Sequence, residues 1–400
     1  MRFHQTAILT GGIALASVLI VTAARAEKPN RPKPTVSGPV QLAVDKGLKW
    51  LVSVQGDDGG WGQDGGATSY IRKSERIESS GNDVANTAVA AEALLQAGNT
   101  PSGGPYKDSL RRAVTFILEH TDKSPAEGLA ITDLQGTQIQ RKLGPYIDTF
   151  LTSKLLAELD GRMGNPQLNA RVRKSLEKCV AKIEKNQLKD GSWNVAGGWA
   201  PILGTSMASQ SLYAAKQKGV AVDQAIMAKV EAYTENTAAQ PAAAGAGGSG
   251  AGRGGMAMTM SSASTVEVSA AAAGVPLYKS AQELEQLTRT DKDRKKNAVR
   301  INAINGQLSD AGFSTGYGSI GGEEFFSYLN VSESLRRTGG PVWDKWNTET
   351  KSKILKTQND DGTWAGHHCI TGRVAVTSAA ILNLLADREP EQSVAPAAGK

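Results

Sequence analysis

A seven-residue pattern, Gln-x-x-Asp-Gly-x-Trp, occurs three times in this chain of 400 residues. The copies begin at Gln55, Gln187 and Gln358, so the intervals between them are long and unequal. A repeat of this kind indicates similar structural units that pack against one another around a common axis. The pattern therefore constrains the architecture of the chain, and it leaves the chemistry open.

Each copy combines turn residues with a large residue that favours burial. Asp accepts hydrogen bonds from nearby backbone amides and Gly adopts a positive φ, so Asp-Gly favours a turn. An aliphatic residue lies four positions before each Gln, one helical turn back on the same face. We predict that each copy ends an outer helix as a structural joint, in which the Gln amide satisfies terminal backbone groups beneath a buried Trp. The residues of these joints are Gln55, Asp58, Gly59, Trp61, Gln187, Asp190, Gly191, Trp193, Gln358, Asp361, Gly362 and Trp364.

Apolar residues at helical spacing, separated by Gly and Pro, predict six helix–turn–helix pairs between residues 40 and 386. The second helix of each well-defined pair is rich in Ala, Ser and Thr, whereas the first carries more charged residues. Because small side chains allow helices to crowd around an axis, we expect the second helices to be inner and the first to be outer. The predicted pairs are 40–55 with 83–97, 107–119 with 145–159, 168–187 with 205–218, 222–233 with 262–273, 280–304 with 323–337, and 342–358 with 371–386.

The three copies resemble the QW repeats of the terpenoid cyclases and protein prenyltransferases, in which Lys-Gly, an aromatic and an aliphatic residue precede the Gln, Gly and Trp. The first copy has every part of that pattern, including Lys46-Gly47 and Trp50-Leu51, while the other two lack the Lys-Gly and the aromatic residue. The resemblance implies an all-α fold, an α/α toroid with six inner helices inside six outer ones, over residues 40–386.

The segments outside the helical pattern have compositions of their own. Residues 1–26 resemble a secretory signal peptide, with Arg2, an apolar run from 7 to 21 and the small-residue pattern Ala24-Arg25-Ala26. The run is short for a membrane span, so we expect cleavage and a periplasmic or secreted protein without a stable span, although retention as an anchor is an alternative. Residues 27–39 read as a Pro-rich linker, 238–255 as a mobile low-complexity loop, and 387–400 as a disordered tail.

Charge and cysteine content exclude two further classes. Without the signal peptide, 43 basic residues face 39 acidic ones, a net charge of +4, and acids interleave with bases in the densest basic run at 291–296. This pattern is typical of a solvated helix face, so nucleic acid is not an expected partner. Cys179 and Cys369 are the only cysteines, and the helix order places them on opposite sides of the ring. We therefore predict two free thiols instead of a disulfide framework.

The catalytic motifs that the resemblance implies are missing. There is no Asp-x-Asp-Asp acid motif of the cyclases, and aromatic residues, which stabilise carbocations, make up only 5% of the chain. The prenyltransferases bind zinc through Asp, Cys and His, with the Asp two residues before the Cys, and neither cysteine here has that neighbour. The nearest approach is His367-His368-Cys369. Adjacent side chains of an extended segment point to opposite sides, so we expect only His367 and Cys369 to converge as candidate zinc ligands, and our main expectation is no metal or cofactor.

Acidic residues also lie at the predicted starts of two inner helices, at Asp148 and Glu323. The helix dipole favours acids at these positions, which is a structural explanation. If the chain is catalytic, we expect Glu323, Asp148 and His367 around one pocket, with a carboxylic acid as proton donor and the histidine as its partner. Arg373 is a candidate for binding an anionic ligand.

Two functions therefore remain open. The first is an exported binding or interaction module for an unknown protein or hydrophobic ligand. The alternative is a cyclase-like or prenyltransferase-like enzyme that acts on an isoprenoid or other hydrophobic substrate in the central cavity. An enzyme predicts a deep apolar pocket with convergent acids or a metal, whereas a module predicts a filled or shallow centre.

Overall fold

The computed structural model describes residues 38–64, 81–193, 201–239, 275–309 and 321–388, which belong to one compact unit, Val36–Lys400. The predicted signal peptide, most of the Pro-rich linker, most of the low-complexity loop and most of the tail lie outside these residues. Secondary structure in the described residues is helical, without a strand, and none of these helices is long and apolar enough to cross a bilayer.

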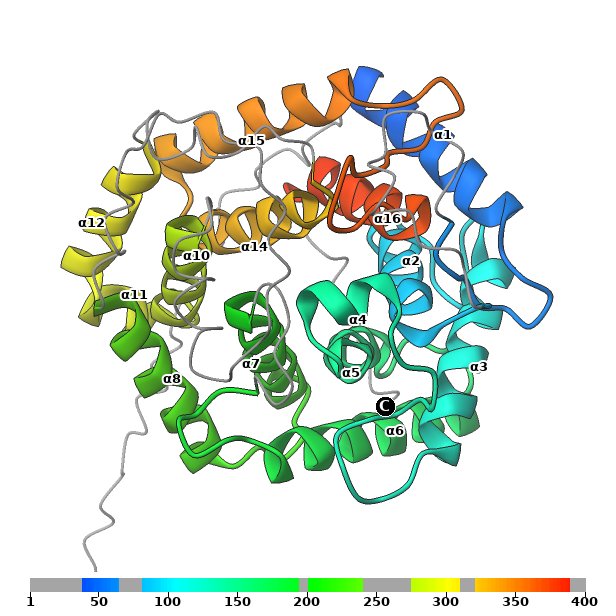
Figure 1. Ribbon diagram of the computed structural model, residues 1–400, viewed down its shortest axis with the longest axis horizontal. Coiled ribbons are helices and arrows are strands. Elements are labelled where there is room, and N and C mark those ends of the chain that lie inside the picture. Colours follow the sequence, from blue (N-terminus) through cyan, green and yellow to red (C-terminus); the bar gives the residue numbers. More distant parts are fainter. Residues whose placement is uncertain (1–37, 65–80, 194–200, 240–274, 310–320, 389–400) are drawn as a thin grey trace, which may run out of the picture. The chain divides into compact units, whose positions relative to one another are not determined.

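In the described part of the chain, twelve helices alternate between an inner and an outer layer (Figure 1). The inner helices are α2 (Val84–Gln96), α5 (Ile147–Leu159), α7 (Pro201–Gln217), α10 (Val275–Leu287), α14 (Gly322–Thr338) and α16 (Arg373–Leu384). The outer helices are α1 (Gly38–Ser53), α3 (Lys107–Lys123), α6 (Pro166–Lys185), α8 (Gln224–Ala239), α12 (Ala298–Ser309) and α15 (Gly340–Lys356). Two short helices, α4 (Gln138–Leu143) and α11 (Asp291–Lys296), lie in connections between them.

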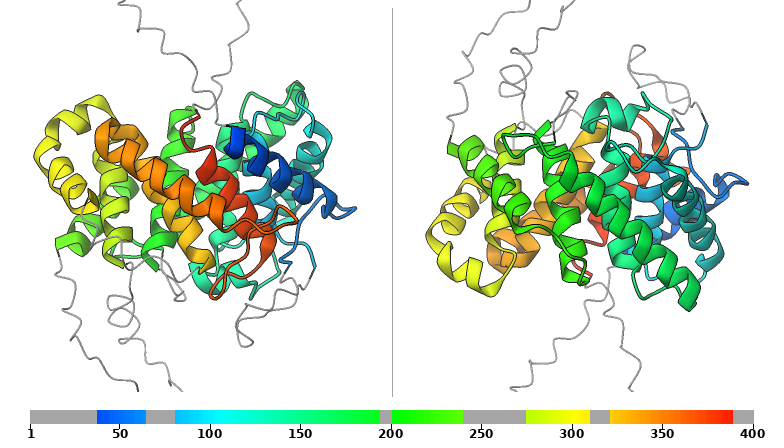
Figure 2. Two further views of the ribbon diagram at one scale, coloured as in Figure 1. Left: turned by 90° about the horizontal axis from the view of Figure 1, so that it is seen from above. Right: turned by 90° about the horizontal axis from the view of Figure 1, so that it is seen from below.

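The inner helices form a closed ring. Each packs against the next in chain order, and α16 packs back against α2. The outer layer closes at the same place, because α15 contacts both α12 and α1, as the edge-on view shows (Figure 2, left). The all-α prediction of an α/α toroid is therefore confirmed.

Burial explains the two layers. In α2, every residue from Val84 to Leu95 is buried, so this helix has no exposed face over that range. In α6, a single stripe that includes Val172, Leu176 and Ile183 is buried, while most of its lysines and arginines lie outside that stripe. A helix buried all round belongs in the interior and an amphipathic one at the surface, as the sequence predicted.

The fourth and fifth predicted pairs need correction. The expected inner helix at 262–273 lies outside the described residues, and α10 takes the inner position of that pair. The expected outer helix at 280–304 is wrong, because α10 ends at Leu287. Thr290 then begins a separate helix, α11, with a capping box. The sequence predicted an outer helix here because this segment contains several charged residues. Its Glu285 is buried by pairing with Arg289 and Arg337.

Three tryptophans end three outer helices in the same way. Each indole nitrogen donates to the carbonyl oxygen of the aliphatic residue ten positions earlier, near the end of the helix, at 2.7–2.8 Å. The pairs are Trp61–Leu51, Trp193–Ile183 and Trp364–Ile354. Each of these carbonyls, in the last turn of its helix, also accepts a longer bond of 3.1–3.3 Å from a backbone amide three residues later, so each buried Trp adds a second donor and covers the helix end.

The three glutamines join neighbouring outer helices. Each amide nitrogen donates to the carbonyl of the Gly in its own turn and to a carbonyl of the following outer helix. The second acceptors are Ser109 in α3 for Gln55, Ile226 in α8 for Gln187, and Ala43 in α1 for Gln358. The bond from Gln358 connects the last outer helix to the first, at the point where the ring closes.

Each Trp-containing turn requires its Gly because the next outer helix lies close to it. Gly59, Gly191 and Gly362 have φ of +89°, +93° and +89°. A Cβ on Gly191 would lie 2.2 Å from the Lys229 carbonyl oxygen of α8, and one on Gly59 would lie 2.6 Å from the Arg112 carbonyl oxygen of α3. Both the backbone conformation and the close approach of the next helix therefore require Gly.

Candidate metal-binding site

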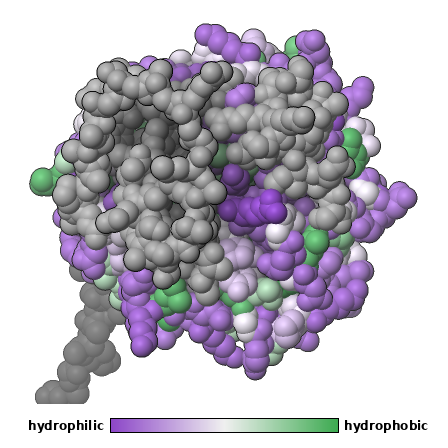
Figure 3. All heavy atoms as spheres, viewed as in Figure 1, coloured by the Kyte–Doolittle hydropathy of each residue, from purple (hydrophilic) through white to green (hydrophobic). Residues whose placement is uncertain are grey.

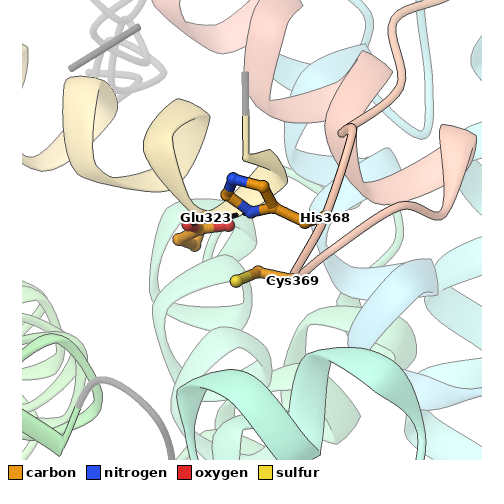
Figure 4. Close-up of side chains that lie close together, drawn as sticks. All are labelled: Glu323, His368 and Cys369. Atoms are coloured by element: carbon orange, nitrogen blue, oxygen red, sulfur yellow. Dashed lines mark ion pairs between the residues drawn. The ribbon is translucent and has the colours of Figure 1, made fainter. Parts of the chain in front are cut away.

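Three side chains of metal-ligand type converge where two inner helices begin (Figure 4). Glu323 lies in the first turn of α14, and His368 and Cys369 lie in the loop before α16. Their ligand atoms all lie within 4.8 Å of one another. The three residues are 3%, 9% and 7% exposed, so the cluster is buried.

The backbone of Cys369 explains how two consecutive residues face the same group. Its φ is +62°, and it is the one non-glycine with a positive φ among the described residues. This left-handed conformation breaks the alternation of an extended segment. The expectation that only His367 and Cys369 converge is therefore wrong, and His368 takes the place of His367. The half-buried His367 packs its ring edge-on against His368, with centroids 5.6 Å apart.

Glycines allow the loop and the start of α14 to touch. The Gly322 amide donates to the His368 carbonyl oxygen at 3.1 Å. A Cβ on Gly322 would lie 1.7 Å from the Ile370 carbonyl oxygen, and one on Gly366 would lie 2.0 Å from it. A Cβ on Gly321 would lie 2.4 Å from the Glu323 carboxylate. The backbone therefore holds the three ligand-type side chains together without spare room.

Burial raises the pKa of Glu323 to about 7, and Glu324 adds to the rise. A hydrogen bond with the Cys369 thiol and the charge of Lys142 act in the opposite direction. His368 Nδ1 lies 3.8 Å from Glu323 Oε1, and Glu323 Oε2 accepts no hydrogen bond within the described structure. A buried carboxyl with this pKa ionises readily when a cation binds beside it.

The donor set fits zinc. Carboxylate oxygen, imidazole nitrogen and thiolate sulfur are its usual protein ligands, at about 2.0–2.3 Å from the ion. Around a tetrahedral ion such atoms lie roughly 3.3–3.8 Å apart, so contraction by about 1 Å brings this cluster to a zinc geometry. Three protein ligands are typical of zinc sites that keep a fourth position for another molecule.

Asp148 has a different environment. It is buried at the start of α5, where Oδ1 accepts from the Ala85 amide at 3.1 Å and Oδ2 accepts from Gln140 Nε2 at 2.7 Å. Burial raises its pKa to about 7, and neighbouring Asp83 contributes to the rise. Its hydrogen bonds connect α5 to α2 and α4. The catalytic hypothesis placed Asp148 with Glu323 and His367 around one pocket. Among the described contacts, none joins Asp148 to either residue.

Arg373 is also engaged by its own chain. Its guanidinium pairs with Asp361 at 2.8 Å and with Asp64 at 2.5 Å, and it lies over the Trp50 ring at 4.9 Å from the centroid. Two carboxylates thus neutralise the side chain that the sequence suggested for an anionic ligand. Arg373 joins the first and third Trp-containing turns to α16.

A small cavity lies between the described inner helices. The cavity there has a volume of about 30 Å³ and is lined by five inner helices, with Phe150, Met207 and Phe326 among its walls. Lys154 Nζ lies 2.7 Å from Glu92 and 2.8 Å from Glu333, which line the same cavity. Ligand pockets usually measure about 300–1,000 Å³. On the visible face of the molecule, hydrophobic spots are scattered over a mostly hydrophilic described surface (Figure 3).

Comparison with known proteins returned structural matches alone. No family model and no curated protein matches the sequence. The solved structure of the type II terpene cyclase MstE from Scytonema matches with 10% identity over 88% of this chain and 98% of that chain, at a TM-score of 0.49. A single-residue variant matches with 11% identity over 87% and 96%, also at 0.49. Another variant, in complex with its substrate geranylgeranyl dihydroxybenzoate, matches with 10% identity over 88% and 97%, at 0.32. Identity this low carries no information on the ligand of this chain.

Proposed function

We propose that this protein is an exported α/α-toroid binding module that holds a zinc ion through Glu323, His368 and Cys369. The observation that carries the proposal is the convergence of three buried ligand atoms within 4.8 Å of one another. The predicted signal peptide at residues 1–26 supports a periplasmic or secreted location.

Each residue has a defined part in holding the ion. Cys369 binds as the thiolate, Glu323 as the carboxylate and His368 through a neutral imidazole nitrogen, so binding releases protons from the cluster. When bound, zinc supplies a Lewis acid with one position open to a donor atom of another molecule. The glycine contacts of this region keep the ligand-bearing loop against α14.

The small cavity between the described inner helices supports binding over isoprenoid conversion. A cavity of about 30 Å³ has room for about one water molecule, far from the volume of a polyisoprenoid chain. Lys154, with Glu92 and Glu333 bonded to it, also places charge where a carbocation route needs aromatic walls. The cavity between these described residues is too small for the substrate of the second hypothesis, a cyclase-like or prenyltransferase-like enzyme.

Metal analysis of purified protein tests the proposal. Wild type is expected to carry about one zinc per chain after dialysis, because three charged or soft ligands bind in a buried site. His368→Ala and Cys369→Ala are expected to lose the metal. The matched variants His367→Ala and Cys179→Ala, which change the neighbouring histidine and the other cysteine, are expected to keep it. Metal-free wild type, or zinc retained by all four variants, would overturn the proposal.

A further inference from the structure

Gln138, in the short helix α4, holds the backbone that follows the ligand loop. Its side-chain oxygen accepts from the Thr371 amide at 2.7 Å and from the Gly372 amide at 3.1 Å. Its side-chain nitrogen donates to Thr371 Oγ1 at 2.9 Å. The backbone amide of Gln138 donates to Gln63 Oε1 at 2.9 Å. One buried glutamine thus connects α4, the first Trp-containing segment and the N-terminal end of α16.

The position of this contact matters for the cluster. Thr371 lies two residues after Cys369, and another attachment of the loop is the bond between Gly322 and His368. The ligand-bearing residues therefore lie between one anchor on α14 and one on α4. Because Cys369 has a left-handed backbone, we expect loss of the α4 contact to favour an extended conformation that turns the thiol away from His368.

We propose that Gln138 is a positioning residue for the Glu323–His368–Cys369 site, and this inference rests on the proposed function. The hydrogen bonds described above connect Gln138 to Thr371, Gly372 and Gln63. It acts through the two backbone amides before α16, which belong to buried residues and lose this acceptor when Gln138 is replaced. Residues that orient metal ligands in this indirect way typically change metal affinity 10- to 100-fold when they are replaced.

Three variants test the role through zinc affinity, measured by competition with a chelator. Gln138→Leu removes both acceptor and donor, and we expect binding about 10- to 100-fold weaker. Gln138→Glu keeps an acceptor for both amides at a helix N-terminus, where a carboxylate is favoured, so we expect affinity close to wild type. Gln135→Leu changes an exposed glutamine that bonds only Thr132 among the described residues, and is expected to match wild type. Wild-type affinity in Gln138→Leu would overturn the inference.

A second measurement on metal-free protein does not depend on zinc. The rates at which a thiol reagent alkylates Cys369 and Cys179 are followed separately by peptide mass spectrometry. Gln138→Leu is expected to accelerate the reaction of Cys369 at least tenfold and to leave Cys179, buried in α6, unchanged. Equal acceleration of both cysteines would indicate general loosening and contradict a positioning role, as would no acceleration. If wild type purifies without zinc and Gln138→Leu still accelerates the alkylation of Cys369, the zinc site is refuted. The role of Gln138 in ordering the loop is then retained.

Discussion

At the scale of single residues, Cys369 is the unusual one, because its backbone adopts a conformation that side chains with a Cβ rarely occupy. A φ of +62° costs an L-residue on the order of 1 kcal/mol, which the surrounding contacts must offset. The strain brings the thiol beside His368 and Glu323. Strained residues of this kind occur preferentially at binding and catalytic sites.

The strain predicts an unusual order of stability for two substitutions. In metal-free protein, Cys369→Gly is expected to be about 1 kcal/mol more stable than Cys369→Ala, because Gly adopts this φ without a Cβ clash. At an ordinary position Ala is the more stable of the two. Urea unfolding of both variants measures the difference. An Ala variant as stable as the Gly variant would show that the backbone at this position is unstrained.

The same residue explains what could be predicted of the site. Glu323 and Cys369 were recognisable as acid and thiol at the starts of inner helices, and both belong to the cluster. His368 was missed because the expected extended backbone excluded it. A cysteine in the sequence does not predict a positive φ at its position. Gly321, Gly322 and Gly366 are the signal that was available, since several glycines around ligand-type residues indicate close backbone approach.

At the scale of elements, the Trp-containing turns determine where outer helices end and which neighbour they touch. Trp193 is buried, donates to the Ile183 carbonyl oxygen at 2.7 Å and packs edge-on against Phe150 of α5. The second turn thus attaches α6 both to the inner layer and, through Gln187, to α8.

Replacement of Trp193 separates packing from hydrogen bonding. Trp193→Ala is expected to lower the free energy of unfolding by roughly 3–5 kcal/mol, because it opens a cavity and removes the indole hydrogen bond to the Ile183 carbonyl oxygen. Trp193→Phe keeps most of the packing and is expected to cost less than Trp193→Ala. Denaturant unfolding provides both values. An unchanged midpoint for Trp193→Ala would show that the turn does not hold the helices together.

Periodicity predicted most of the helices because their buried faces are apolar and their breaks carry Gly or Pro. It failed for α10, whose buried Glu283 and Glu285 resemble surface residues in the sequence. Arg300 pairs with Glu283, and Arg289 and Arg337 pair with Glu285, which offsets the cost of burying these acids. All three arginines lie outside α10, and Arg337 is 52 residues from Glu285, so the sequence of this helix by itself does not reveal them.

At the scale of the whole molecule, charged residues connect inner helices across the ring. Lys154 of α5 bonds Glu92 of α2 and Glu333 of α14, and Glu158 lies one helical turn after it. Three acids therefore share one lysine near the centre. Burial and the charge of Glu92 raise the pKa of Glu158 to about 7.

This pKa predicts a pH dependence of stability. The folded-state pKa of Glu158 lies above its ordinary value of 4.5, so the folded state binds the proton more tightly than the unfolded state. Its contribution is fully present below about pH 4.5 and is lost as pH rises through about 7. Glu158→Gln is therefore expected to match wild type at pH 5 and to be more stable at pH 8, by urea unfolding. Identical pH dependence in the two proteins would contradict this account.

The most direct test of the metal site is a crystal structure of the zinc-loaded protein, with anomalous scattering measured at the zinc absorption edge. We predict one strong peak within about 2.0–2.3 Å of a Glu323 oxygen, a His368 nitrogen and the Cys369 sulfur. A loaded crystal with no peak at this cluster, or with its peak on His367, would contradict the account.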